Sequence, residues 1–190
     1  APARIGVFAC GHELYWPQFP ELKDRLLGYH RRFCERLSEL DVTVINGGLS
    51  DSANTASDVA SKLRSGDLDL VIANVVTYST SGAAVTVIQK VGKPVVLAGL
   101  QPDAALDYDT ATTFDQLRND NVTSLPEICC ALRRCGIQPL EVIFGQLEED
   151  RAWSKLRNVC RIARCLHALR RGRIGLMGHT YEGMLDMNSD

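Results

Sequence analysis

Five short apolar runs, separated by longer segments in which apolar residues recur at helical spacing, constrain the fold of this chain more than any other feature. The runs are residues 4–10, 42–45, 68–76, 95–98 and 141–144. The helical segments are residues 20–40, 51–64, 83–90, 125–135 and 149–171, with a shorter one at 113–118 inside the irregular stretch 103–124. Regular alternation of strands and helices indicates a parallel sheet whose strands are connected through helices.

The apolar runs also predict how this sheet is covered. The run at residues 68–76 is almost continuously apolar, which is typical of a parallel strand buried on both faces. We therefore predict an α/β fold with a doubly wound, mostly parallel sheet and helices on both faces. The flavodoxin-like strand order 2-1-3-4-5 is favoured over a dinucleotide-binding order. A sixth short strand is predicted at residues 172–177.

The chain has enough residues for one full core and a short extension. It holds 190 residues, 45% of them hydrophobic. Residues 1–147 are predicted to form an N-terminal α/β domain and residues 148–171 a connecting helix. Residues 172–190 repeat the opening pattern, since Arg-Ile-Gly is again followed closely by Gly-His, and they are predicted to start a second α/β domain. We expect the chain, which begins with Ala, to be a fragment of a larger protein.

Charge and cysteine content exclude several classes of partner. The net charge of -2 favours neither nucleic acid nor an anionic membrane surface, and no apolar run is long enough to span a membrane. The N-terminus lacks a signal-peptide pattern. Seven cysteines, an odd number, favour reduced thiols in a cytoplasmic protein. Cys129, Cys130 and Cys135 are interpreted as buried small hydrophobes rather than metal ligands, because no CxxC pair or nearby histidine accompanies them.

Polar and aromatic side chains collect in the loops that follow the predicted strands. The first loop holds His12, Glu13, Tyr15 and Trp16 within five positions, and the loop after the third strand holds Tyr78 among serines and threonines. Ligands of open α/β sheets bind beyond the carboxyl ends of the strands. Aromatic faces with scattered neutral donors suit a sugar or another hydroxylated ligand, so these loops predict a polar wall for such a molecule.

Several other interpretations of these loops have less support from the sequence. In the simplest, Leu14 and Trp16 only cap the core. No G-x-G-x-x-G or P-loop supports a nucleotide site, and no G-x-S-x-G elbow turns Ser79 into a hydrolase nucleophile. His179 and Glu182 form only a weak i, i+3 pair, and two ligands from one loop do not make a metal site.

Three stretches resemble the N-terminal domain of the L-arabinose isomerase and L-fucose isomerase superfamily, running into the start of its central domain. Gly-His-Glu-Leu-Tyr-Trp at 11–16 is similar to the arabinose isomerases' G-S-Q-H-L-Y-G loop, with His12 in place of a substrate-contacting Gln. Thr-Tyr-Ser at 77–79 is similar to their T-F-S, so Tyr78 replaces a sugar-contacting Phe. The stretch 173–186 is similar to the one that opens the family's central domain.

The resemblance implies the substrate-pocket and oligomerisation domain of a metal-dependent aldose-ketose isomerase, acting on a monosaccharide within a trimer-based homo-oligomer. It implies no catalytic or metal-binding residue in this chain, because the family's Mn²⁺ ligands lie in later domains. One departure is residues 119–124, which lack the histidine of the family's N-Q-S-A-H-G stretch. The substrate-binding residues that the resemblance implies are His12, Leu14, Tyr15, Tyr78, Thr123 and Tyr181.

Two alternatives to the isomerase remain open from the sequence. A stand-alone flavodoxin-like module that binds a small molecule or regulates another protein would share the same loops and need no enzymatic parent. A periplasmic-type sugar sensor is disfavoured by the seven cysteines and by the lack of an export signal.

Overall fold

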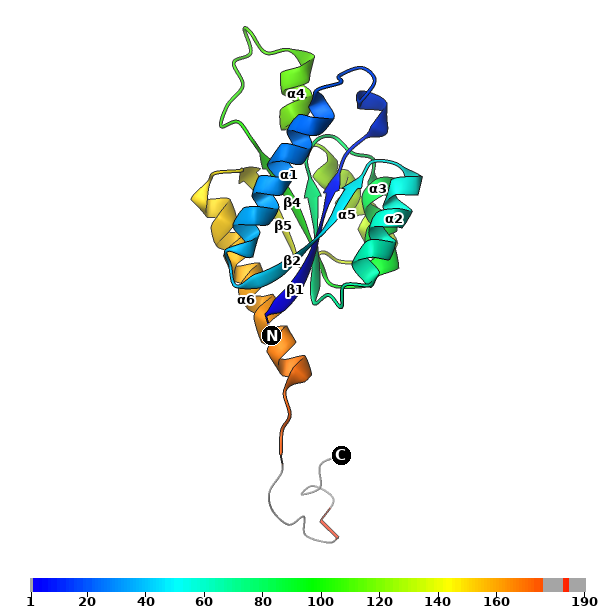
Figure 1. The fold of residues 1–190 in the computed structure, drawn as a ribbon, viewed down its shortest axis with the longest axis vertical. Coiled ribbons are helices and arrows are strands. Elements are labelled where there is room, and N and C mark those ends of the chain that lie inside the picture. The colour runs from blue at the N-terminus through cyan, green and yellow to red at the C-terminus, as the bar shows by residue number, and fades with distance from the viewer. Residues whose placement is uncertain (1, 176–182, 185–190) are drawn as a thin grey trace.

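Five parallel strands form one sheet in the order β2-β1-β3-β4-β5 in the computed structural model, which describes residues 2–175 and 183–184 (Figure 1). The strands are β1 (Ala3–Cys10), β2 (Val42–Ser50), β3 (Leu70–Val75), β4 (Val95–Gln101) and β5 (Glu141–Gln146). The helices are α1 (Leu22–Ser38), α2 (Ala53–Arg64), α3 (Ser81–Val91), α4 (Thr113–Asn119), α5 (Ser124–Arg134) and α6 (Asp150–Arg171). The predicted doubly wound, flavodoxin-like fold is confirmed.

Helices cover both faces of the sheet and build two separate apolar layers. On one face, Phe33 and Leu37 of α1 and Trp153 and Leu156 of α6 pack against the strands. On the other face, side chains of α2, α3 and α5 pack against the same strands. Because both faces are covered, every residue of β3 is buried. This explains the continuously apolar run that predicted a parallel sheet.

Strand β2 is longer than its sequence predicted. The glycines at 47 and 48 suggested a turn, but β2 continues to Ser50 through a bulge: Val7 of β1 pairs with Asn46, and the next residue, Phe8, pairs with Gly48. Gly48 takes a φ of 98°, which suits glycine. The apolar run at residues 42–45 therefore predicted too short a strand, because the glycines that follow it form a bulge rather than a turn.

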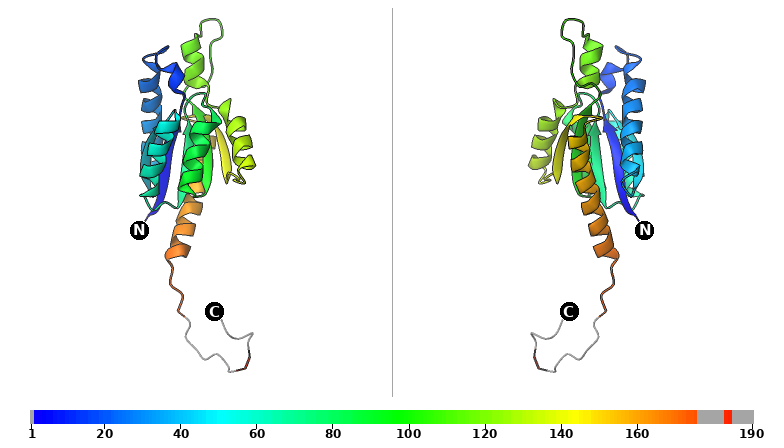
Figure 2. Two further views of the ribbon diagram at one scale, coloured as in Figure 1. Left: turned by 90° about the vertical axis from the view of Figure 1, so that its right-hand side faces the viewer. Right: turned by 90° about the vertical axis from the view of Figure 1, so that its left-hand side faces the viewer.

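Helix α6, predicted as a connection between domains, packs against the sheet with its first turns and extends past the amino end of the sheet with its last (Figures 1 and 2). Residues 172–175 follow it without forming a strand. The predicted sixth strand is therefore wrong over these four positions, which are exposed and pair with no other strand. Its remainder, at 176–177, lies outside the described residues.

In the described ranges, no helix combines the length and apolarity needed to cross a bilayer.

The cysteines differ in burial. Cys10, Cys34 and Cys160 are buried, Cys129 is half-buried, and Cys130 and Cys135 are exposed. The prediction that Cys130 and Cys135 are buried is wrong, because Cys130 lies on the outer side of the amphipathic helix α5 and Cys135 follows its last residue. Burial raises the pKa of the Cys10 thiol, that of Cys34 to about 12 and that of Cys160 to about 11.

These buried thiols predict a loss of stability in alkali. Above about pH 9 the thiols ionise in the unfolded chain but stay protonated in the fold, so stability that is complete below that pH is lost as the pH rises. Each thiol contributes a fall of about 1.4 kcal/mol per pH unit until its folded pKa is reached. Urea unfolding of Cys10→Ala between neutral and alkaline pH should show a shallower fall than the parent. An unchanged slope would contradict this explanation.

Candidate functional site

The loops predicted to bind a ligand meet at the point where the sheet reverses its winding. His12 follows β1 and Tyr78 lies just beyond β3, and these two strands are neighbours in the sheet. From β1 the chain crosses through α1 to β2 on one side, and from β3 it crosses through α3 to β4 on the other. In open α/β sheets this switch point is where connections part and leave a crevice.

Three aromatic rings gather there, and we refer to His12, Tyr15 and Tyr78 as the aromatic triplet. Tyr15 lies on a short 3-10 helix, η1 (Glu13–Tyr15), and its ring centroid is 5.1 Å from that of His12, at an interplanar angle of 84°. The ring of Tyr78 is 6.2 Å from His12, also edge-on. All three side chains are half-buried, so each keeps part of its ring open to a ligand.

Two carboxylates border the triplet and keep its phenols protonated. Burial and then the charge of Asp120 raise the pKa of Tyr15, while the charge of Glu127 is the main cause that raises the pKa of Tyr78. The hydroxyl of Thr123 donates a hydrogen bond to Asp120. Glu127 accepts from the backbone N–H of Ser81 at 2.8 Å, and this contact lowers its pKa. The tyrosines thus remain hydroxyl donors beside a fixed negative charge.

Asp120 also connects the triplet to a hollow of about 370 Å³ beside the end of β4. Gln101, Asn119 and Tyr108 line the same hollow. The segment that carries Asp120 is held in place by the next residue, Asn121. Its side-chain amide donates to the backbone oxygens of Val75 at 2.9 Å and Leu100 at 3.1 Å. Asn121 therefore joins the ends of β3 and β4 and sets where Asp120 stands.

The first loop is anchored by residues other than the triplet. The indole Nε1 of Trp16 donates to Asp51 at 2.7 Å, and the backbone N–H of Gly11 donates to Ser50 at 3.0 Å. The Trp16 ring lies over Gly11, where an added Cβ would come within 3.1 Å of it. Trp16 therefore secures the loop, and it also packs against a small buried cluster, as the interpretation in which it caps the core predicted. Leu14, by contrast, is 62% exposed and caps no core.

The structure places four of the six predicted binding residues together. His12, Tyr15, Tyr78 and Thr123 share the carboxyl end of the sheet, Leu14 stands exposed beside them, and Tyr181 lies outside the described residues. Asp120 and Glu127 were not predicted as site residues. Asp120 lies in a polar stretch with no helical or strand period, and Glu127 lies in the first turn of a correctly predicted helix, where an acidic residue is ordinary.

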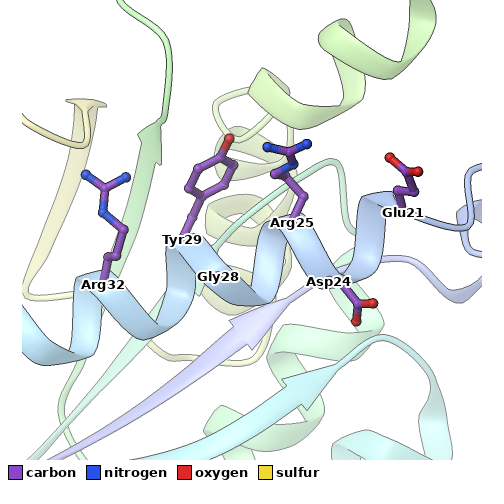
Figure 3. A pocket seen from close by; sticks show the side chains of 6 residues that line it. All are labelled: Glu21, Asp24, Arg25, Gly28, Tyr29 and Arg32. Atoms are coloured by element: carbon purple, nitrogen blue, oxygen red, sulfur yellow. The ribbon is translucent and has the colours of Figure 1, made fainter.

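Neither a metal site nor a ligand-selective hollow along α1 is found among the described residues. Within residues 2–175 and 183–184, no three His, Cys, Asp or Glu side chains form a group that could hold a metal ion. A hollow of about 450 Å³ lies along α1, where Arg25, Tyr29 and Arg32 project to the same side (Figure 3). Acidic residues share this hollow, and the Tyr29 hydroxyl already accepts a hydrogen bond from Arg118 at 3.1 Å. Nothing in it selects a ligand.

Comparison with known proteins does not support the family suggested by the loops. No protein-family model and no curated protein matches the chain. Among solved structures the chain is similar to Est24, a carbohydrate acetylesterase from Sinorhizobium meliloti, at 15% identity and a TM-score of 0.40. The match covers 86% of this chain and 99% of that chain. A likeness of this size says nothing about activity.

The predicted membership in the L-arabinose and L-fucose isomerase superfamily is therefore wrong, because neither a family model nor a curated protein of that superfamily matches the chain. The isomerase reaction and the manganese centre that it implied are withdrawn with it. The resemblance rested on short loops at strand ends, where polar and aromatic residues gather in many α/β proteins.

Proposed function

We propose that this chain binds a small hydroxylated ligand of the monosaccharide class at the carboxyl end of its sheet. The observation that supports this most directly is the aromatic triplet, in which His12 from the end of β1 meets Tyr78 from the end of β3 and Tyr15 from η1. These rings stand at the switch point, where ligands of such sheets are bound. The chain then acts as a binding or regulatory module of flavodoxin-like fold.

The chemistry of the site suits such a ligand. Ring faces pack against the C–H groups of a sugar, and the phenol of Tyr15 donates to its oxygens. The hydroxyl of Tyr78, which donates to Glu127 at 3.4 Å, and the carboxylate of Asp120 accept from the hydroxyl groups of the sugar. The hollow beside Asp120 provides a recess for one such molecule. Because the site is open to water, we expect weak binding that is governed by shape and hydroxyl pattern.

A hydrolytic function has less support from the same side chains. Among the hydrogen bonds of the described residues, none links His12 to a serine or a carboxylate, as a nucleophile-activating triad requires. The thiol at the end of β1, Cys10, is buried and its pKa is raised, so it is a poor nucleophile. The groups at this end of the sheet are therefore better suited to holding a ligand than to cleaving one.

Alanine at His12 or Tyr78 is expected to weaken monosaccharide binding about tenfold, because each change removes one of the three ring surfaces. NMR titration of the chain with a panel of aldoses and ketoses would identify a sugar that shifts resonances of the first loop. The same titration would then compare the variants.

Phe144→Ala is the matched control, since this aromatic ring is 64% exposed on the edge strand β5 and lies outside the triplet. We expect it to bind the sugar as the parent does. Binding that is equal in all three variants, or absent from the parent for every sugar tested, would overturn the proposed function.

A further inference from the structure

A basic groove lies at the opposite end of the sheet from the aromatic triplet. It has a volume of about 1130 Å³ and runs between the last turns of α6 and the start of β1 at Pro2 and Ala3. Figures 1 and 2 show this part of α6 continuing beyond the amino end of the sheet. Three arginines of α6 line the groove: Arg161, Arg164 and Arg171.

A buried histidine, His167, lines the same groove and has an unused ring nitrogen. Its side chain is only 6% exposed, and Nδ1 lies 2.8 Å from a carboxylate oxygen of Asp69. The same oxygen accepts the backbone N–H of Arg4 at 2.8 Å. The other ring nitrogen, Nε2, is buried and meets no hydrogen-bond partner among the described residues. Buried polar atoms without a hydrogen-bond partner are uncommon, so Nε2 is expected to bind a group that completes its hydrogen bonding.

The carboxylate of Asp69 determines what Nε2 offers. An ionised carboxylate only accepts hydrogen bonds, so Nδ1 of His167 carries the proton that joins the pair. Nε2 is then an acceptor in the neutral ring and a donor in the charged ring. A ligand group that binds at Nε2 must therefore be able to accept or to donate a hydrogen bond.

The charges around the groove favour a small anion over a long one. Arg161 forms no ion pair within the described part of the chain, whereas Arg164 pairs with Asp41 at 3.3 Å and Arg171 with Asp67 at 2.6 Å. Of these two carboxylates, Asp41 itself lines the groove and both lie at the surface. Because the whole chain also carries a net charge of -2, an extended polyanion would meet repulsion here. Guanidinium groups bind oxyanions through paired hydrogen bonds.

We propose that the groove lined by Arg161, Arg164, Arg171 and His167 binds the phosphate group of a small molecule. Phosphate suits both the arginines and His167. Its oxygens accept hydrogen bonds from the guanidinium groups, and a single proton joins one of its oxygens to Nε2 of His167. Whichever partner bears that proton, the hydrogen bond is made. Sulfate lacks a proton at neutral pH and therefore serves as a close comparison. The site is independent of the monosaccharide proposal, since it lies at the other end of the sheet.

The test is titration of the full chain with inorganic phosphate, glycerol phosphate and sulfate, followed by calorimetry or by NMR of the α6 amides. Saturable binding of phosphate, tighter than sulfate, is expected. Arg161→Gln should weaken phosphate binding about fivefold, because this exposed arginine forms no ion pair among the described residues that would compete with phosphate. His167→Gln should abolish the preference for phosphate over sulfate. Tighter binding of glycerol phosphate than of phosphate would indicate a phosphorylated metabolite, and the reverse would indicate the free ion.

Arg134→Gln is the matched control, because Arg134 is an exposed arginine at the end of α5 and does not line the groove. It should bind phosphate as the parent does. Equal losses in Arg161→Gln and Arg134→Gln would show attraction by overall charge and overturn the proposal. So would a parent chain that shows no saturation, or that binds sulfate as well as phosphate.

Discussion

Replacing Trp153 with alanine is expected to lower the free energy of unfolding by about 4 kcal/mol. Trp153 is 1% exposed and lies between α6 and the sheet, where its ring centroid is 5.4 Å from that of Phe33. Its Nε1 donates to the backbone oxygen of Leu147 at 2.6 Å, and the guanidinium of Arg36 lies 4.3 Å above the ring. The substitution therefore leaves a cavity and an arginine without its aromatic partner, and it removes one of the two hydrogen bonds to the Leu147 carbonyl, which still accepts from Arg36 at 3.2 Å.

Urea unfolding followed by circular dichroism measures this loss without depending on tryptophan fluorescence. Tyr108→Ala is a suitable control, because Tyr108 is 90% exposed and its removal should change stability by less than about 0.5 kcal/mol. A loss below about 1 kcal/mol in Trp153→Ala would mean that α6 does not depend on this side chain to stay docked.

Asp69→Ala is expected to cost about 3 kcal/mol, the second-largest effect. One carboxylate oxygen accepts both the Arg4 backbone N–H and Nδ1 of His167, and the side chain is almost completely buried. Removing it strands two donors away from water, at the point where β1, β3 and α6 meet.

Asp69→Asn separates the hydrogen bonds from the charge. Its amide oxygen can still accept from both donors, so we expect about half of the loss seen with alanine. Asp58→Ala, at an exposed position on α2, should leave the unfolding midpoint unchanged. If asparagine and alanine destabilise the protein equally, the negative charge rather than the hydrogen bonds holds this junction together.

Local patterns in the sequence were sufficient to predict the fold and the loops that meet at the candidate site. The strand order, both helical layers and the loops that carry His12 and Tyr78 followed from apolar periodicity and from the rule that ligands meet the carboxyl ends of strands. The bulge at Gly47 and Gly48 did not, because a glycine pair reads as a turn unless the neighbouring strand is known. Short loop matches, in turn, proved too unspecific to assign a family.

What the sequence determined by itself was therefore the order of elements and the chemical character of the strand ends, since periodicity and side-chain type are local properties. Only the tertiary structure decided which distant groups meet. Asp120 reaches the aromatic triplet because Asn121 ties its segment to the ends of β3 and β4, and His167 meets Asp69 across 98 positions of the chain. Contacts of that range arise from packing α6 against the sheet, and no local pattern contains them.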